Sequence, residues 1–311
     1  MVSKKYLIKQ KLCHLPLFNK YITNRSININ KKNISRVEET LNKKGLKITG
    51  PQDYKYINTS DYTHCNIWGS GYSASKSSEN KSFTTGSFDI GFSFSYLMEV
   101  DFDLYFLENA SAKISELVSI QKKGLREFLD LKKCEIIFKN ILEEKNDLNY
   151  AIDEYSNLVS FARDIMVPHY INSNSVYKNT MQILLQKDPF YFRQSCSSVI
   201  TSIIFARFLG FKDIVLHGVD FGGKYFFDLP NYDKFSEFKP PQNDLNVKGV
   251  NKDIRIYDKK YRYGNAKHPT CDCLKRFLPL LKENLKKENI HLYSASENSP
   301  LSKILPIYEM I

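Results

Sequence analysis

The segment from residue 197 to residue 223 constrains the fold more than any other part of this sequence. An apolar stretch with helical spacing, "SSVITSIIFARFLG", ends at Gly210, and the apolar run "DIVLH" follows almost at once. Such a run is typical of a strand that is buried on both faces, as in parallel sheets covered by helices. The strand leads directly into Gly218 and Asp220, so it would carry an aspartate to the carboxyl edge of a sheet.

Further strands and helices alternate along the chain. We expect strands at residues 64–68, 88–94, 103–107, 134–142, 159–167, 213–220 and 291–296, and helices at 111–131, 179–186, 197–210 and 271–290. This alternation indicates an α/β fold with a Rossmann-like, mostly parallel sheet flanked by helices. The main domain is expected to cover residues 62–311, with a polar loop at about 229–262. Residues 1–61 would form a basic N-terminal arm.

The positive charge of the chain is concentrated in this arm. Residues 1–50 hold twelve Lys or Arg residues and two Glu, which accounts for +10 of the total net charge of +11. Leu7, Ile8 and Phe18 lie among the lysines, and this mixture favours an anionic membrane surface over a bare phosphate backbone. We expect Pro16 to interrupt any single long helix here. A disordered, solubilising tail is the alternative.

Other classes of protein are disfavoured. No window approaches 18 uncharged apolar residues, and the N-terminus lacks the apolar region of a secretory signal. The six cysteines are sparse, which suits a reducing compartment. His268, Cys271 and Cys273 have no matching second pair of ligands, so we expect no metal site. Binding of nucleic acid is disfavoured because the basic residues lie on the arm and not on the sheet domain.

The first candidate site is the loop "GSGYS", which follows the expected strand at 64–68. Gly69, Ser70, Gly71 and Ser73 would open a helix there, and the N–H groups of such a loop can cradle a phosphate. An ordinary tight turn is the alternative. The dinucleotide fingerprint is incomplete, because no acidic residue follows at the end of the second strand.

Two further clusters follow in the sequence. Glu108 could act as a general base and Asn109 could bind a nucleobase or ribose, although a helix cap would use the same residues. Arg193, Ser197 and Ser198 precede the long apolar helix, where guanidinium and hydroxyl groups suit a carboxylate or phosphate. A helix cap alone would explain only one of these two serines.

Two single residues complete the candidates. His268 precedes a helix, can titrate near neutral pH and can accept a proton from a hydroxyl group, although a lone histidine is often structural. Asp220 stands at the carboxyl end of its strand, and Gly218 beside it would let the backbone approach a ligand closely. The alternative is that Asp220 only caps its own turn.

These pieces, in this order, resemble the bacterial sialyltransferases of glycosyltransferase family 42 over roughly residues 62–307. "GSGYS" is similar to the family's G-N-G-P-S loop, "FDIGF" to its F-D-V strand and "FLENAS" to its Asn-containing turn. The strongest match is the series "FLGFKD", "GVDF" and "YFFD", followed by His268 and "IHLYSASENSPLSKILP". Ser70 and Tyr72 depart from the family's Asn and Pro in the first loop.

The resemblance implies a GT-A-variant fold and a CMP-activated acidic sugar, most simply sialic acid, as donor. The sugar would pass with inversion to a hydroxyl of a cell-surface glycan such as lipooligosaccharide or capsule, without a metal ion or other cofactor. His268 would be the general base and Tyr225 would lie near the donor phosphate, with Tyr263 replacing a family tyrosine that is Asn265 here. The nucleotide or the donor carboxylate would be held by Gly69, Ser70, Gly71, Ser73, Asn109, Arg193, Ser197, Ser198 and Gly218.

Two alternatives remain open. The pair His268–Pro269 is similar to bacterial Kdo transferases, some of which retain anomeric configuration, so the donor could be CMP-Kdo or another CMP-nonulosonate with Asp220 as nucleophile. A non-catalytic nucleotide-binding protein of the same fold belongs to another class. As an enzyme, the protein would work in the cytoplasm at the inner membrane, to which residues 1–50 would bind. The acceptor and the oligomeric state stay open, and a homo-oligomer is compatible with the sequence.

Overall fold

The structure is a computed structural model that describes residues 16–75, 80–107, 115–139, 152–153, 155–167, 174–195, 197–221, 225–226 and 269–309. The strands are β1 (Ile48–Thr49), β2 (His64–Trp68), β3 (Ser87–Phe92), β4 (Leu104–Leu107), β5 (Glu135–Phe138), β6 (Val159–Ala162), β7 (Asp164–Met166), β8 (Phe192–Gln194), β9 (Asp213–His217) and β10 (His291–Ser294). The α-helices are α2 (Pro16–Lys43), α4 (Ser115–Phe128), α6 (Asn174–Leu184), α7 (Ser198–Leu209) and α8 (Pro269–Lys286). Short 3-10 helices are η1 (Pro51–Tyr54), η2 (Thr59–Asp61), η3 (Lys81–Thr84), η4 (Ser95–Leu97) and η8 (Pro300–Lys303).

Eight of the strands form one parallel sheet in the order β1-β6-β5-β4-β3-β2-β9-β10. From β2 the chain winds through β3, β4, β5 and β6 toward one edge, and β9 and β10 then extend the sheet on the other side of β2. The winding therefore reverses between β2 and β9. In sheets of this kind, ligands bind outside the carboxyl ends of the strands at such a switch point.

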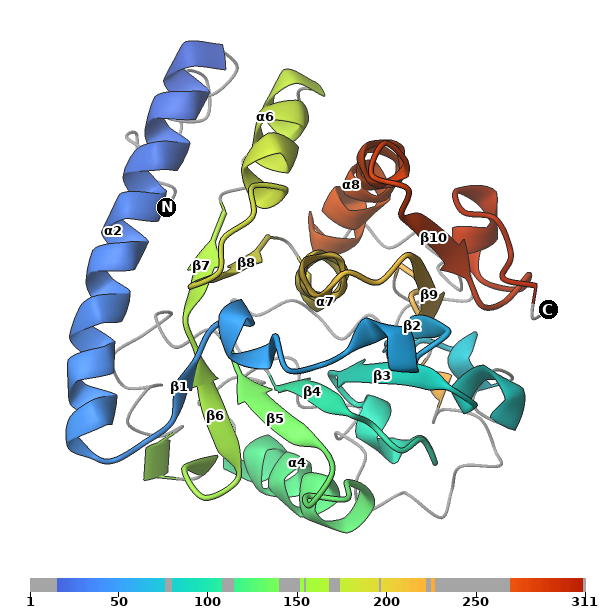
Figure 1. Cartoon of the computed structure of the whole chain (residues 1–311), viewed down its shortest axis with the longest axis horizontal. Helices are drawn as coiled ribbons and strands as arrows, with labels where there is room; N and C mark the ends of the chain where they lie inside the picture. Colours follow the sequence, from blue (N-terminus) through green and yellow to red (C-terminus); the bar gives the residue numbers. More distant parts are fainter. Residues whose placement is uncertain are drawn as a thin grey trace.

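Helices cover both faces of the sheet (Figure 1). The apolar side of α8 and nearly all of α7 pack with the strands in one hydrophobic cluster, and α4 packs in a second cluster on the other face. The α7 helix is apolar all round because it is buried from Ser198 to Arg207. Gly210 ends it with a left-handed φ of 111°, which confirms the predicted stop. No helix within the described ranges is both long and apolar enough to cross a membrane.

The second half of the expected N-terminal arm packs with the sheet and its helices. Strand β1 pairs with β6, and Tyr54 and Ile34 are buried in the core. The sheet therefore begins at residue 48, earlier than the boundary expected near residue 61. Pro16 is the first described residue of α2, which runs from it to Lys43 without a break.

The expected strand at 159–167 is divided into β6 and β7. At Arg163 the chain changes partners: its N–H donates to the carbonyl of Thr49, and its carbonyl accepts from the N–H of Phe192. Strand β7 then pairs with β8, which the sequence analysis did not anticipate, in a separate two-stranded sheet. The helix expected at 179–186 is α6, which begins earlier. The remaining expected strands and helices are confirmed, with shifted ends, wherever they fall on described residues.

A buried carboxylate lies on the face of the sheet opposite to α7. Asp89 accepts hydrogen bonds from Trp68 Nε1 (2.6 Å), Asn66 Nδ2 (2.9 Å) and Ser87 Oγ (2.5 Å). The ring of His217 continues this network, since its Nε2 lies 2.9 Å from Asn66 Oδ1. Burial raises the pKa of Asp89 to about 6, although the three hydrogen bonds lower it in part.

Asp89 should therefore make stability depend on pH. The folded protein holds this proton more tightly than the unfolded chain does, so the contribution to stability is full below about pH 4 and is lost as the pH rises through about 6, by roughly 3 kcal/mol. Urea unfolding across this range should show a larger decline in the wild type than in Asp89→Asn, because the other buried carboxyl groups are unchanged in that variant. Asp101→Asn, at an exposed position, is the matched control. An equal decline in wild type and Asp89→Asn would contradict the assignment.

Candidate functional site

Two glycine-containing turns meet at the switch point. The first turn (residues 69–73) follows β2, and the second turn (residues 218–221) follows β9. The N–H of Gly71 donates to the carbonyl of Gly218 (2.8 Å). A Cβ atom at Gly71 would lie 2.5 Å from the oxygen of Gly218, and one at Gly218 would lie 2.4 Å from the oxygen of Gly69. Only glycine permits this approach, so the glycines bring the two turns against each other.

The carboxylate of Asp220 ties three segments together. It accepts hydrogen bonds from the Ser73 N–H (2.7 Å), from Ser73 Oγ (2.6 Å) and from Ser299 Oγ (2.9 Å), which follows β10. The side chain is 4% exposed, and burial raises its pKa while these hydrogen bonds lower it. The sequence predicted a loop at residues 69–73 whose N–H groups could cradle a phosphate, and an Asp220 that faces the ligand edge or caps its own turn. In the structure Asp220 bonds another turn and not its own, and it occupies the Ser73 N–H.

Side chains and strained backbone surround the two turns. Ser70 Oγ lies 3.4 Å from Ser93 Oγ, at the end of β3, and Tyr225 pairs through its backbone with Gly71. Ser93 and Phe221 have left-handed φ values of 61° and 55°. Residues other than glycine rarely adopt such values, and those that do are enriched at functional sites. The strain therefore marks this edge as the candidate site.

A second polar cluster lies further along the same edge of the sheet. Lys139 follows β5 and is fully buried, and its Nζ donates to Ser198 Oγ (3.1 Å) and to Gln194 Oε1 (3.4 Å). Gln194 in turn donates to Asp164, and Ser197 caps α7. Because strands lie about 4.8 Å apart and β5 is three strands from β2, this cluster is roughly 14 Å from the first turn.

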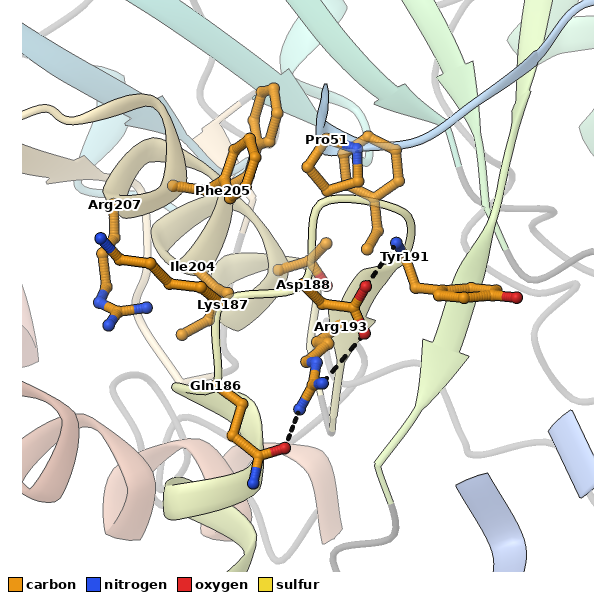
Figure 2. A pocket seen from close by; sticks show the side chains of 12 residues that line it. Pro51, Gln186, Lys187, Asp188, Tyr191, Arg193, Ile204, Phe205 and Arg207 are labelled. Carbon is orange, nitrogen blue, oxygen red and sulfur yellow. Dashed lines mark hydrogen bonds and ion pairs between the residues drawn. The ribbon is translucent and has the colours of Figure 1, made fainter. Parts of the chain in front are cut away.

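Arg193 does not face this edge. Its guanidinium donates to the carboxylate of Asp188 (3.0 Å) and to the amide oxygen of Gln186 (3.0 Å), as Figure 2 shows. It also donates to the carbonyl of Ile183. Side chains alternate along a strand, so Gln194 and not Arg193 reaches the second cluster. The cavity beside Arg193 holds about 20 Å³, which is enough for a water molecule but not for a nucleotide.

The structure thus brings together one group of the predicted residues: Gly69, Ser70, Gly71, Ser73, Gly218, Asp220 and Tyr225. Ser197 and Ser198 lie at the second cluster. Glu108, Asn109, Tyr263 and His268 lie outside the described residues, so their placement stays a prediction.

Sequence analysis missed two residues of this edge, Lys139 and Ser299. A lysine at the end of an otherwise apolar strand was a signal for the first, whereas nothing in the sequence connects Ser299 with Asp220. In the part of the chain that the structure describes, no three His, Cys, Asp or Glu side chains are arranged to hold a metal ion.

No protein-family model and no curated protein matches the sequence. The similar solved structures include Campylobacter sialyltransferases, as the sequence resemblance predicted. The monofunctional alpha-2,3-sialyltransferase Cst-I from Campylobacter jejuni has 18% identity and a TM-score of 0.44, over 81% of this chain and 82% of that chain. The sialyltransferase CstII from Campylobacter jejuni, in complex with the substrate analogue CMP-3FNeuAc, has 16% identity and a TM-score of 0.40, over 79% and 86%.

A further similar structure is the sialyltransferase CST-II in complex with a trisaccharide acceptor and CMP, with 17% identity and a TM-score of 0.41, over 79% of this chain and 89% of that chain. These identities and TM-scores are low. The similarity therefore assigns neither a role to any single residue nor an activity to this chain.

Replacing Asp220 should loosen the joined turns. Asp220→Asn puts an N–H group where the carboxylate accepts from Ser73 or Ser299, so the free energy of unfolding should fall by about 2 kcal/mol. Ser299→Ala removes one of the three hydrogen bonds and should cost about 1 kcal/mol. Urea unfolding measures both changes. Unchanged stability in Asp220→Asn would show that these bonds do not hold the turns together.

Proposed function

We propose that this chain is a glycosyltransferase that transfers an acidic sugar, sialic acid in the first instance, from a CMP-activated donor to a hydroxyl of a cell-surface glycan. The observation that carries the proposal is the meeting of the first and second turns at the switch point between β2 and β9. This is where doubly wound sheets bind nucleotides. The residues of both turns are also those whose motifs resemble the sialyltransferases of family 42.

The second cluster suits the negative charge of such a donor. Lys139 directs its ammonium group at Ser198, the first residue of α7, where the helix dipole is positive. Both features favour an anion at this point of the edge. Asp220 already occupies the Ser73 N–H. We therefore assign the nucleoside and its phosphate to the two turns beside Tyr225, and the carboxylate of the donor sugar to the region of Ser198.

In the proposed reaction, the acceptor hydroxyl oxygen attacks the anomeric carbon of the sugar while the bond from that carbon to the phosphate oxygen breaks. CMP leaves with the bonding electron pair, and the hydroxyl proton passes to His268 as general base. Stabilising the charge on the leaving phosphate is the larger electrostatic task, and the proposal gives part of it to Tyr225, which pairs with the first turn. The reaction as proposed needs no metal ion.

We place Asp220 as a positioning residue and not as a nucleophile. A nucleophile needs an oxygen that can approach the anomeric carbon. Both oxygens of Asp220 accept hydrogen bonds, and the side chain is almost completely buried. This supports inverting transfer of sialic acid over a retaining reaction with CMP-Kdo. Glu108 and Asn109, which follow β4 in the sequence, stay candidates for a second base and a nucleoside ligand.

Nucleotide binding is the first test of the proposal. Calorimetry with CMP, CDP, UMP and NAD, in the presence of EDTA, should show binding of CMP with a clear preference. His268→Ala should retain that binding and lose about 10²- to 10⁴-fold in the rate of transfer from CMP-sialic acid. Binding of CMP without transfer from either CMP-sialic acid or CMP-Kdo would identify a non-catalytic protein. A preference for another nucleotide would remove the basis of the proposal.

Lys139 gives a separate test of the second cluster. Lys139→Met removes the buried charge and keeps an apolar side chain of similar length, so CMP-sialic acid should bind about tenfold more weakly while CMP, which lacks the carboxylate, binds as before. Lys132→Met, at an exposed position in the turn before β5, is the matched control. An equal loss for CMP-sialic acid and CMP would indicate a structural role alone.

A further inference from the structure

The outward face of α2 carries cationic and apolar side chains in one continuous row. The row follows spacings of three and four residues, which place side chains on one face of a helix. Each of its members is exposed. We call it the outer stripe of α2, and it consists of Leu17, Tyr21, Arg25, Ile29, Lys32 and Arg36.

The opposite face of α2 is packed against the protein. Thr23, Ile34 and Leu41 are buried there, and Asn30 Nδ2 donates to the carbonyl of Met166 at the end of β7 (3.2 Å). The helix lies along the β1 side of the sheet, beside β7 and α6 (Figure 1). The outer stripe is therefore held in a fixed direction relative to the sheet, and it is not a loose tail.

Large apolar side chains of this stripe are exposed to solvent. Leu17 is 85% exposed, Tyr21 60% and Ile29 50%. A groove along the same face is lined by Tyr21, Arg25, Ile29 and Lys32, together with Asn24 and Asn28. Apolar groups that alternate with cations along a helix fit the boundary between lipid head groups and acyl chains, where both find a suitable environment.

We propose that the outer stripe of α2 binds an anionic phospholipid surface. A second copy of this chain would bring the same cations and be repelled. Nucleic acid would pair with the cations but gives no burial to Leu17 or Ile29. Since β9 and β10 lie at the far end of the sheet from β1, a membrane on the stripe leaves the first and second turns uncovered. This inference does not depend on the proposed reaction.

The test is co-sedimentation of the full chain with vesicles of phosphatidylcholine alone or mixed with phosphatidylserine. Binding should require phosphatidylserine and should weaken between about 0.1 M and about 1 M salt, as the screening length falls from about 10 Å to about 3 Å. The variant Arg25→Glu, Lys32→Glu, Arg36→Glu should bind at least tenfold more weakly, because each cation near an anionic surface contributes about fivefold.

The matched control carries the same change in charge away from the stripe: Lys286→Glu, Lys287→Glu and Lys303→Glu, all at exposed positions. It should bind like the wild type, and thermal unfolding of both variants checks that they fold.

A third variant separates lipid from other anionic partners. Leu17→Ser, Tyr21→Ser, Ile29→Ser keeps every charge, so it should lose affinity for phosphatidylserine vesicles at low and high salt alike. Unchanged binding by this variant, or binding to duplex DNA with none to the vesicles, would indicate that the outer stripe binds a polyanion and not a lipid surface. Equal effects of the stripe variant and its control on binding would overturn the proposal.

Discussion

A single buried carboxylate joins the three segments on which the candidate site depends. Asp220 accepts hydrogen bonds from Ser73 in the first turn and from Ser299 after β10, while its own backbone belongs to the second turn. The glycines allow the turns to touch and add the backbone hydrogen bond from Gly71 to Gly218, but they contribute no side-chain contact. The N–H group that Ser73 could have offered to an anionic ligand is therefore occupied by a carboxylate of the protein, and an anionic donor must find its positive partner elsewhere along the edge.

The residue directly before each turn, at the end of its strand, supports the turn. Trp68 ends β2 and His217 ends β9, and their rings stack with centroids 3.7 Å apart. Hydrogen bonds from Trp68 to Asp89 and between His217 and Asn66 hold both rings in place. One face of the sheet is thus apolar under α7 and α8, and the other carries a buried polar network directly before the site. These hydrogen bonds make the network rigid, although His217 Nδ1 has no hydrogen-bond partner among the described residues, and a rigid base suits turns that pack so closely.

Positive charge is also placed at particular positions. At the candidate site, Lys139 is buried beside Ser198. The larger excess of positive charge lies on residues 1–50, and three of its cations, Arg25, Lys32 and Arg36, lie in the outer stripe of α2. The short-range anion site follows β5, two strands from β1, and shares no residue with that stripe. This separation lets the two be varied independently, which the proposed variants exploit.

Local pattern in the sequence determined the α/β class, most of the strands, the apolar α7 helix with its stop at Gly210, and the gathering of Gly71, Ser73 and Asp220 at one edge. Periodicity and strand direction suffice for this, because parallel strands present their carboxyl ends together. Only the tertiary structure decided that Asp220 bonds Ser73 and Ser299 and that Arg193 turns away toward Asp188. It also decided that β1 and α2 belong to the packed unit. Except for the short-range pairing of Arg193 with Asp188, these outcomes depend on contacts between residues far apart in the chain, and a single sequence shows no periodic pattern for such contacts.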